Sequence, residues 1–249
     1  MIKIKDLCKS FGGRQVLKHI SLDIRAGETL AIIGGSGSGK STLLKLLIGL
    51  EKPTSGEICL MGQSMSELKE RELDKLRMNM GMVFQYSALF DSMTVGDNVA
   101  FGLREHTDFS EEQIQRIVAE KLAQVGLPGI EKAMPGELSG GMKKRVGLAR
   151  AIAFDPKVIF YDEPSSGLDP IMTAKIDELI IETQKKQQAT SVVVTHDMVS
   201  ACMIADRIAM IYEGELIAAD TVENFRKSED ARVQSFLQRM YIGREKTTV

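Results

Sequence analysis

Gly34-Gly35-Ser36-Gly37-Ser38-Gly39-Lys40-Ser41-Thr42 matches the pattern G-x-x-x-x-G-K-[ST], a glycine-rich loop that wraps the phosphates of a nucleotide. The preceding residues, Glu28–Ile33, predict a short buried strand, and Ser41–Ile48 predicts a helix with a broad apolar face. The glycines let backbone N–H groups surround an anion, and the start of the helix adds unpaired donors. Lys40 is placed to reach the β- and γ-phosphates, and the Ser41 hydroxyl to ligate Mg²⁺. A flexible glycine turn is the simpler alternative, but a chance match in a chain of this length is roughly a one-in-a-hundred event.

The composition is that of an ordinary globular protein. The chain has 249 residues, of which 43% are hydrophobic and 27% charged, and its formal net charge is −2. That balance gives no global reason to expect nucleic-acid binding. No apolar run approaches the roughly 20 residues that a membrane-spanning helix needs, so we expect none. Three cysteines with no paired spacing fit a reducing compartment better than a disulfide framework.

The order of predicted elements indicates an α/β fold. Strands are expected over Ile2–Leu7, Val16–Ile24, Glu57–Met61 and Met80–Phe84, with a charged helical stretch over Ser64–Arg77. Residues 87–154 show only helical periodicity, which predicts a helical insertion in an α/β core. Beyond it, a hairpin is expected around Glu213-Gly214 and an amphipathic helix over Val222–Tyr241.

A pair of acidic residues after the helical region is a further signal. Val158-Ile159-Phe160-Tyr161 predicts a buried strand that ends in Asp162 and Glu163. A strand ending in an acid places a carboxylate at the edge of a parallel sheet, near bound phosphate and Mg²⁺. Asp162 is then expected to hold the metal, and Glu163 to accept a proton from the attacking water.

Other candidate residues are weaker when taken singly. Phe11 is either packed under a turn or a platform for an adenine ring, and its spacing alone favours packing. Gln85 is either a solvated strand end or, beside a phosphate site, an amide that reaches Mg²⁺ or the attacking water. His196 follows another buried strand, at the end of the sheet where α/β folds place their ligands. Ser139-Gly140-Gly141 is either a plain helix cap or a second anion-receptive helix start. Lys143-Lys144-Arg145 is interpreted as a helix surface.

Taken together and in this order, these motifs resemble the ATP-binding subunits of ABC transporters, over essentially the whole chain. The resemblance implies a P-loop NTPase core of ABC type, with a mixed sheet and helices, an antiparallel β subdomain and a helical insertion. It divides the single domain 1–249 into a nucleotide-binding core with its β subdomain, a helical subdomain and a C-terminal helical tail. The core with its β subdomain covers 1–86 and 155–220, the helical subdomain covers 87–154, and the tail covers 221–249.

The resemblance also implies a head-to-tail homodimer holding two ATP molecules with Mg²⁺. One subunit would bind ATP through Phe11, the loop Gly34–Thr42, Gln85, Asp162 and His196, and would use Glu163, His196 and Gln85 in catalysis. Ser41, Gln85 and Asp162 would hold the metal. The partner copy would contribute Ser139, Gly140, Gly141 and Asp169. Phe11 stands where tyrosine is common, and Met142 replaces the usual glutamine after Leu-Ser-Gly-Gly, so a contact from that amide is lost.

The stretch Leu138–Ala153 is further similar to the ATPases of Mla/Mce-type lipid transporters, as are Ser87–Phe90, Asn98–Ala100 and Leu103–Thr107. This similarity implies phospholipid transport between the membranes of Gram-negative bacteria, on the cytoplasmic face of the inner membrane. The implied partners are an integral membrane permease (MlaE-like), an Mce-domain lipid-binding protein (MlaD-like) and a small STAS-type regulatory protein (MlaB-like), with no nucleic acid.

Two alternatives stay open from the sequence. One is the ATPase of an importer for amino acids or metals. The other is an ABC-type ATPase that acts on DNA or ribosomes, although such proteins usually carry a long coiled-coil insertion or two nucleotide domains, and this sequence has neither.

Overall fold

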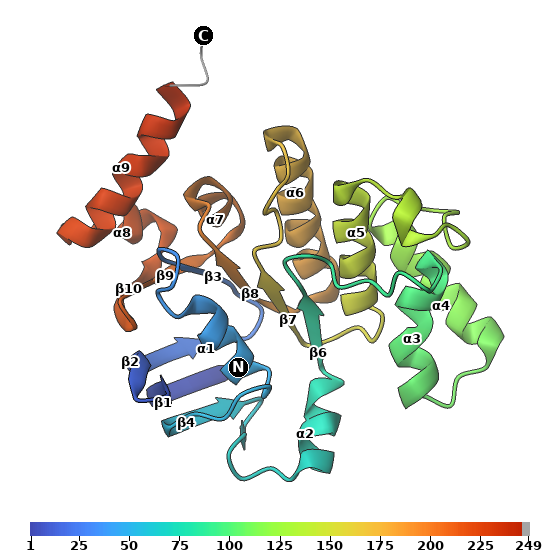
Figure 1. Ribbon diagram of the computed structural model, residues 1–249, viewed down its shortest axis with the longest axis horizontal. Coiled ribbons are helices and arrows are strands. Elements are labelled where there is room, and N and C mark those ends of the chain that lie inside the picture. Colours follow the sequence, from blue (N-terminus) through green and yellow to red (C-terminus); the bar gives the residue numbers. More distant parts are fainter. Residues whose placement is uncertain (246–249) are drawn as a thin grey trace. The chain divides into compact units, whose positions relative to one another are not determined.

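The computed structural model describes residues 1–245, and for residues 239–245 it describes the backbone alone (Figure 1). Two compact units share the chain. The first unit combines the N-terminal part, residues 1–73, with the C-terminal part from Thr190. The second unit is the continuous segment 74–189.

An antiparallel sheet opens the first unit. Its strands are β1 (Ile2–Phe11), β2 (Arg14–Ile24), β4 (Ser55–Leu60) and β5 (Gln63–Ser64), in the order β2-β1-β4-β5. Ile2 of β1 is in register with Ile24 on one side and Leu60 on the other, and all three side chains are buried. The expected antiparallel β layer is therefore present (Figure 1).

The first unit also holds the strands around the phosphate loop. β3 (Thr29–Ile33) lies between β8 (Thr190–Thr195) and β9 (Arg207–Tyr212), parallel to both, and β10 (Glu215–Thr221) pairs antiparallel with β9. Every residue of β3 and β8 is buried, as expected for strands covered on both faces. Helices α1 (Lys40–Leu47), α7 (Met198–Ile204), α8 (Val222–Arg226) and α9 (Ala231–Glu245) complete the unit.

The second unit is mainly helical. It contains the parallel pair β6 (Met80–Val83) and β7 (Val158–Asp162). Between these strands the chain forms helices only: α3 (Val95–His106), α4 (Glu111–Gln124), the short 3₁₀ helix Pro135–Glu137 and α5 (Gly140–Ala151). The long helix α6 (Pro170–Gln187) follows β7. The expected capping box at Ser110 is present, since Ser110 and Gln113 exchange side chain-to-backbone hydrogen bonds.

Two sequence-based expectations are corrected. The helix expected from Ser64 begins only at Glu70 (α2, Glu70–Arg77), because Ser64 pairs with Cys59 in the sheet. The Glu72 carboxylate then accepts a hydrogen bond from the backbone N–H of Lys69 at 2.9 Å, which closes the start of the helix.

The helix expected over Val222–Tyr241 is two helices, α8 and α9. The Asp230 carboxylate accepts a hydrogen bond from the backbone N–H of Arg232 at 2.8 Å, so a new helix starts after a break. Residues 246–249 of the expected tail lie outside the described residues.

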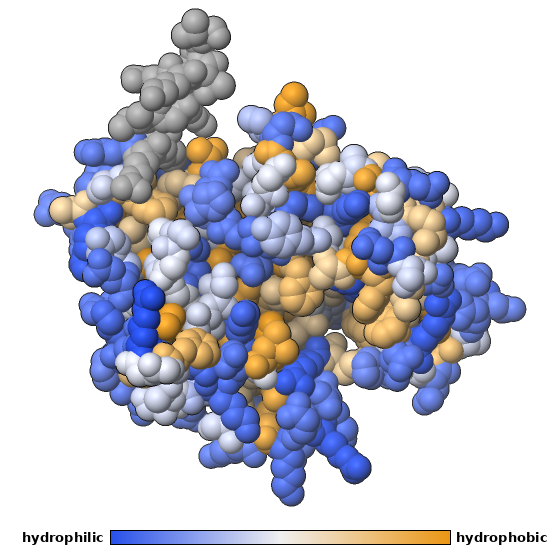
Figure 2. Space-filling model, in the orientation of Figure 1, coloured by the Kyte–Doolittle hydropathy of each residue, from blue (hydrophilic) through white to orange (hydrophobic). Residues whose placement is uncertain are grey.

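Among the described residues, no helix is long and apolar enough to cross a membrane. The three cysteines, Cys8, Cys59 and Cys202, are free thiols. On the face shown in Figure 2, hydrophobic residues form separate orange patches among hydrophilic ones.

Candidate functional site

The glycine-rich loop joins β3 to α1 in the first unit. At two of its glycine positions no residue with a side chain fits. Gly34 has φ of 157°, and an added Cβ would lie 2.2 Å from the carbonyl oxygen of Ile211. Gly39, with φ of 109°, would bring a Cβ to 2.6 Å from the Leu17 side chain. The loop geometry therefore depends on these two positions having no side chain.

Lys40 is the first residue of α1, and its side chain folds back along the loop. Its ammonium donates hydrogen bonds to the carbonyl oxygens of Gly34 at 2.9 Å and Gly35 at 3.0 Å. Only 7% of Lys40 is exposed. The cation of the motif is thus held inside the loop. When a nucleotide binds, its phosphate oxygens can replace the carbonyl oxygens as hydrogen-bond acceptors of the ammonium.

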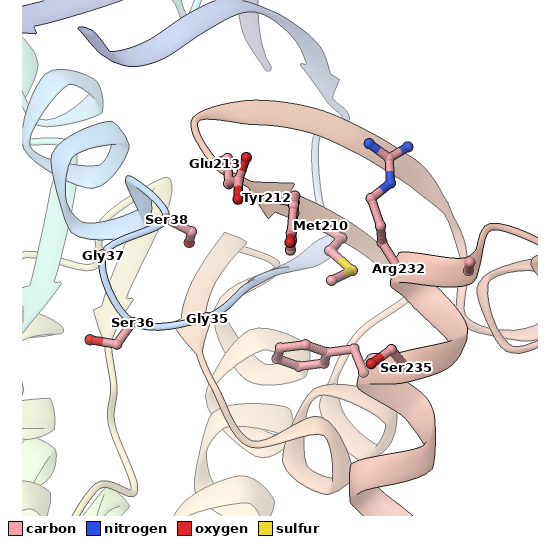
Figure 3. A pocket seen from close by; sticks show the side chains of 11 residues that line it. Gly35, Ser36, Gly37, Ser38, Met210, Tyr212, Glu213, Arg232 and Ser235 are labelled. Carbon is pink, nitrogen blue, oxygen red and sulfur yellow. The ribbon is translucent and has the colours of Figure 1, made fainter. Parts of the chain in front are cut away.

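Two hollows border the loop. The first, of about 420 Å³, is lined by Phe11, Arg14, Val16 and the segment Gly37–Thr42. The second, of about 480 Å³, has the outer turn Gly35–Ser38 on one side and α9 on the other, with Met210, Tyr212 and Glu213 between them (Figure 3). Of the two, the first hollow combines an aromatic ring with Lys40 and Ser41, the residue types that the sequence expects around a nucleotide.

Phe11 lies at the end of β1 with 44% of its surface exposed, so it is not the packed aromatic that the simpler interpretation favours. The Lys9 ammonium lies 4.5 Å from the centre of its ring. Lys9 is itself fixed by the Glu51 carboxylate at 2.9 Å and the Lys52 carbonyl oxygen at 2.7 Å. A cation over one face of an aromatic ring is a favourable contact, and it holds the ring in place.

His196 directly follows β8 and is exposed. Thr195 at the end of β8 pairs in parallel register with Ile33 at the end of β3. Gly34 and His196 therefore leave neighbouring strands at the same edge of the sheet.

The second unit assembles the other expected residues of the reaction. Val83 at the end of β6 is in register with Tyr161 of β7, so Gln85 and the pair Asp162–Glu163 leave the carboxyl ends of neighbouring parallel strands. The Gln85 side chain donates to the Ser166 hydroxyl at 3.4 Å. Glu163 has φ of 47°, a left-handed conformation that is uncommon for a residue with a side chain.

The glycine-rich segment 139–141 starts helix α5 in this unit. The Ser139 hydroxyl accepts a hydrogen bond from the Met142 backbone N–H at 3.3 Å, and Ser139 and Gly140 are both exposed. Gly141 is buried, and an added Cβ would lie 2.5 Å from the end of the Met172 side chain on α6. Asp169 caps α6, since its carboxylate accepts from the N–H groups of Ile171 and Met172, each at 2.9 Å. Within the described chain, these residues act as helix caps and packing positions.

One residue of this cluster is missed by sequence reasoning. The basic run predicts that Lys144 lies on a helix surface, yet only 8% of it is exposed. Its ammonium donates to the carbonyl oxygens of Gln85 at 2.8 Å and Glu163 at 3.4 Å. Burial lowers the pKa of Lys144, and the charge of Glu163 opposes this shift. Helical spacing was the available signal, since Lys144 shares a face of α5 with Gly141 and Leu148, which are also buried.

Comparison with known proteins identifies the family. The family model described as ABC transporter matches residues 17–166. The chain belongs to the ABC transporter family.

Curated relatives cover nearly all of this ABC protein. It is 44% identical to the intermembrane phospholipid transport system ATP-binding protein MlaF of Haemophilus influenzae, over 96% of this chain and 90% of MlaF. It is 45% identical to the probable ribonucleotide transport ATP-binding protein mkl of Mycobacterium leprae, over 97% of this chain and 70% of that protein. It is also 41% identical to the chloroplastic protein TRIGALACTOSYLDIACYLGLYCEROL 3 of Arabidopsis thaliana, over 95% of this chain and 73% of that protein.

Solved structures confirm the ABC ATPase fold. A dimeric ATP-binding cassette in a post-hydrolysis state, bound to ADP and Pi, matches with a TM-score of 0.82 and 34% identity. The match covers 89% of this chain and 99% of that one. The CbiO1 subunit of a Clostridium perfringens ABC transporter complex matches with a TM-score of 0.84 and 31% identity, over 99% and 98% of the two chains.

Proposed function

We propose that this ABC protein is the ATP-hydrolysing subunit of a transporter that moves phospholipid between the inner and outer membranes of a bacterium. The observation that supports phospholipid as the substrate is the 44% identity to MlaF over 96% of this chain. The chain would work through a separate permease, at the cytoplasmic face of the inner membrane.

ATP is the nucleotide that family membership assigns, and the chain's own residues account for its binding. We propose that an adenine ring stacks on Phe11 and that the loop Gly34–Thr42 donates backbone N–H groups and the Lys40 ammonium to the phosphates. The carboxylate of Glu163 would then take a proton from the attacking water, and His196 and Gln85 would orient the reacting groups.

Mg²⁺ suits the oxygen donors that the sequence assigns to it. The described residues hold no cluster of three or more His, Cys, Asp and Glu side chains that could bind a metal by itself. Mg²⁺ requires no such cage, because it binds one or two protein oxygens together with substrate phosphates and water. The Ser41 hydroxyl, the Gln85 amide oxygen and the Asp162 carboxylate would supply these oxygens. The ion would neutralise charge on the phosphates.

A second copy of the chain would complete each site. The solved cassette bound to ADP and Pi is dimeric, which supports the same arrangement here. We propose that the partner copy presents the exposed start of α5, with Ser139, Gly140 and Gly141, to the γ-phosphate. Asp169 would help to link the two sites.

Exposed aromatic residues around the loop that follows β6 support a permease partner. Tyr86 is 87% exposed, Phe90 is 43% exposed and Phe101 of α3 is 39% exposed. The rings of Phe90 and Phe101 pack with their centroids 5.0 Å apart at an angle of 49°, so they form one apolar surface. We propose that a helix of an MlaE-like permease docks on this surface. An MlaD-like Mce-domain protein and an MlaB-like STAS-type regulator are the further proposed partners.

An amino-acid importer is the second candidate function. The methionine import ATP-binding protein MetN of Geobacillus kaustophilus is 40% identical over 96% of this chain and 71% of that protein. This candidate shares the ATPase chemistry and differs only in the permease and its cargo.

Purification with the native membrane partner tests the proposal. The chain should co-purify with a polytopic membrane protein, and in proteoliposomes ATP should drive transfer of a fluorescent phospholipid. Transport of methionine with no phospholipid transfer would favour the importer instead. Recovery with nucleic acid and no membrane protein would overturn both.

A further inference from the structure

Lys144 connects the two residues of the second unit that are proposed to act on the terminal phosphate. It lies on α5, five residues after Ser139 of the glycine-rich start. Its ammonium donates to the backbone carbonyls of Gln85 at 2.8 Å and Glu163 at 3.4 Å. Both bonds are made to backbone carbonyls, so Lys144 acts on the backbones of Gln85 and Glu163.

The contacts close into a ring. The Gln85 side chain donates to the Ser166 hydroxyl at 3.4 Å, and the Ser166 backbone N–H donates to the Glu163 carbonyl at 3.1 Å. Lys144 joins Glu163 back to Gln85. A closed network of this kind restrains its members more than separate contacts would.

Glu163 needs such a restraint. Its φ of 47° is unfavourable for a residue with a side chain and persists only where the surroundings hold it. The Glu163 carbonyl receives donors from both Lys144 and Ser166, which fixes the peptide unit that follows the residue. The backbone at Glu163 decides where its carboxylate can reach.

The loop after Gln85 is held from the same helix. Arg150, also on α5, donates to the carbonyl oxygens of Ser87 at 2.7 Å and Ala88 at 2.6 Å. Ser87 and Ala88 have φ of 62° and 46°, two consecutive residues in the left-handed region. Helix α5 therefore fixes this loop through the backbone carbonyls of residues 85, 87 and 88, and Lys144 extends the connection to Glu163.

We infer that Lys144 is a positioning residue for ATP hydrolysis, which fixes the backbones of Gln85 and Glu163 relative to the start of α5. This inference rests on the proposed roles of Glu163 and Gln85. It predicts that loss of the Lys144 ammonium lowers the rate of hydrolysis and leaves the affinity for ATP unchanged. The ammonium acts through the backbone carbonyls of Gln85 and Glu163, whereas the main ATP contacts are proposed for Phe11 and the loop Gly34–Thr42.

The test compares Lys144→Met with Lys143→Met in the full chain. Lys143 is the preceding lysine on the same helix and is only half-buried. We expect Lys144→Met to lower kcat by about tenfold to a hundredfold, a usual effect of displacing a catalytic group by about 1 Å. The ATP dissociation constant should change by less than about twofold, and Lys143→Met should match the wild type in both, as a neutral substitution does. Equal kcat in the two variants would overturn the inference.

Two further variants keep the test decisive if Lys144→Met does not fold. Lys144→Arg keeps a charged donor able to reach both carbonyls and should recover most of the rate. Lys144→Gln keeps one shorter, uncharged donor and should be slow, so a wild-type rate in Lys144→Gln would also overturn the inference.

Glu163→Gln is measured in parallel. Normal hydrolysis in Glu163→Gln would remove the proposed base, and with it this inference. An inactive Glu163→Gln beside a normal Lys144→Met would remove the inference alone.

Discussion

The carboxamide of Asn98 pairs with both backbone groups of Phe90: its oxygen accepts from the Phe90 N–H at 2.7 Å, and its nitrogen donates to the Phe90 carbonyl at 3.1 Å. The same nitrogen donates to the carbonyls of Met93 at 3.2 Å and Thr94 at 2.9 Å. Asn98 is fully buried. One side chain of α3 thus holds the segment that precedes the helix and presents Phe90.

We therefore expect Asn98→Ala to lower the free energy of unfolding by about 2–4 kcal/mol, because it leaves buried backbone groups without partners. Asn79→Ala is the control, since the Asn79 side chain donates a single bond, to the Lys75 carbonyl at 3.2 Å, near the surface. Its cost should stay below about 1 kcal/mol. Urea denaturation of both variants measures the difference, and equal costs would contradict the role given to Asn98.

Gly39 should tolerate no side chain. Gly39→Ala forces a Cβ to 2.6 Å from the Leu17 side chain at a φ of 109°. We expect a loss of about 2 kcal/mol or more in unfolding free energy, together with loss of ATP binding. Gly35→Ala meets no atom within 4 Å, so its effect on apo stability should be below about 1 kcal/mol. Thermal unfolding of the apo proteins separates the two, and equal melting temperatures would contradict the steric account.

Phe11 should contribute to affinity through its ring alone. Phe11→Ala should weaken ATP binding by about 5- to 100-fold, the usual range for loss of one base–aromatic stack. Phe11→Tyr keeps the ring and should bind within about threefold of the wild type. Phe109→Ala, which removes another exposed ring of 47% exposure in the second unit, is the control. Isothermal titration calorimetry gives the three affinities. Unchanged ATP binding in Phe11→Ala would contradict adenine stacking on this ring.

Arg104 should make the α3–α4 pair sensitive to acid. Its guanidinium hydrogen-bonds Asp97 at 2.8 Å and Glu111 at 2.5 Å. A hydrogen bond from Thr94, followed by that of Arg104, lowers the pKa of Asp97, and the hydrogen bond of Arg104 lowers the pKa of Glu111. Lowered carboxylate pKa values stabilise the fold above the ordinary values of 3.8 and 4.5, and this stabilisation is lost as the pH falls through the lowered values.

Arg104→Met should therefore flatten the acid side of the stability profile between about pH 5 and pH 3. The effect should be modest, because these groups are near the surface and screened by solvent. Arg116→Met, on the exposed side of α4, controls for loss of a charge. Melting temperatures measured across this range test the prediction, and parallel profiles for wild type and Arg104→Met would contradict it.

The sequence predicts most of the elements that carry chemistry, because each has a strong local signal. A buried apolar run followed by glycines and Lys40 determines the strand, loop and helix without reference to the rest of the chain. The apolar strand before Asp162 is equally local. The start of α2 was misplaced because sheet pairing of Ser64 overrides the helical pattern that follows it. Lys144 was missed because a run of three basic residues resembles a surface, and only tertiary packing shows that its ammonium lies among backbone carbonyls.

The most direct measurement of the proposed chemistry is ATP binding and hydrolysis by Glu163→Gln. Glutamine keeps the size of the side chain and removes the proton acceptor. The account predicts ATP affinity within about threefold of the wild type and hydrolysis slower by about 10²- to 10⁴-fold, the usual contribution of a general base. Lys40→Ala, in contrast, should weaken ATP binding itself. Near-normal turnover in Glu163→Gln would contradict the account.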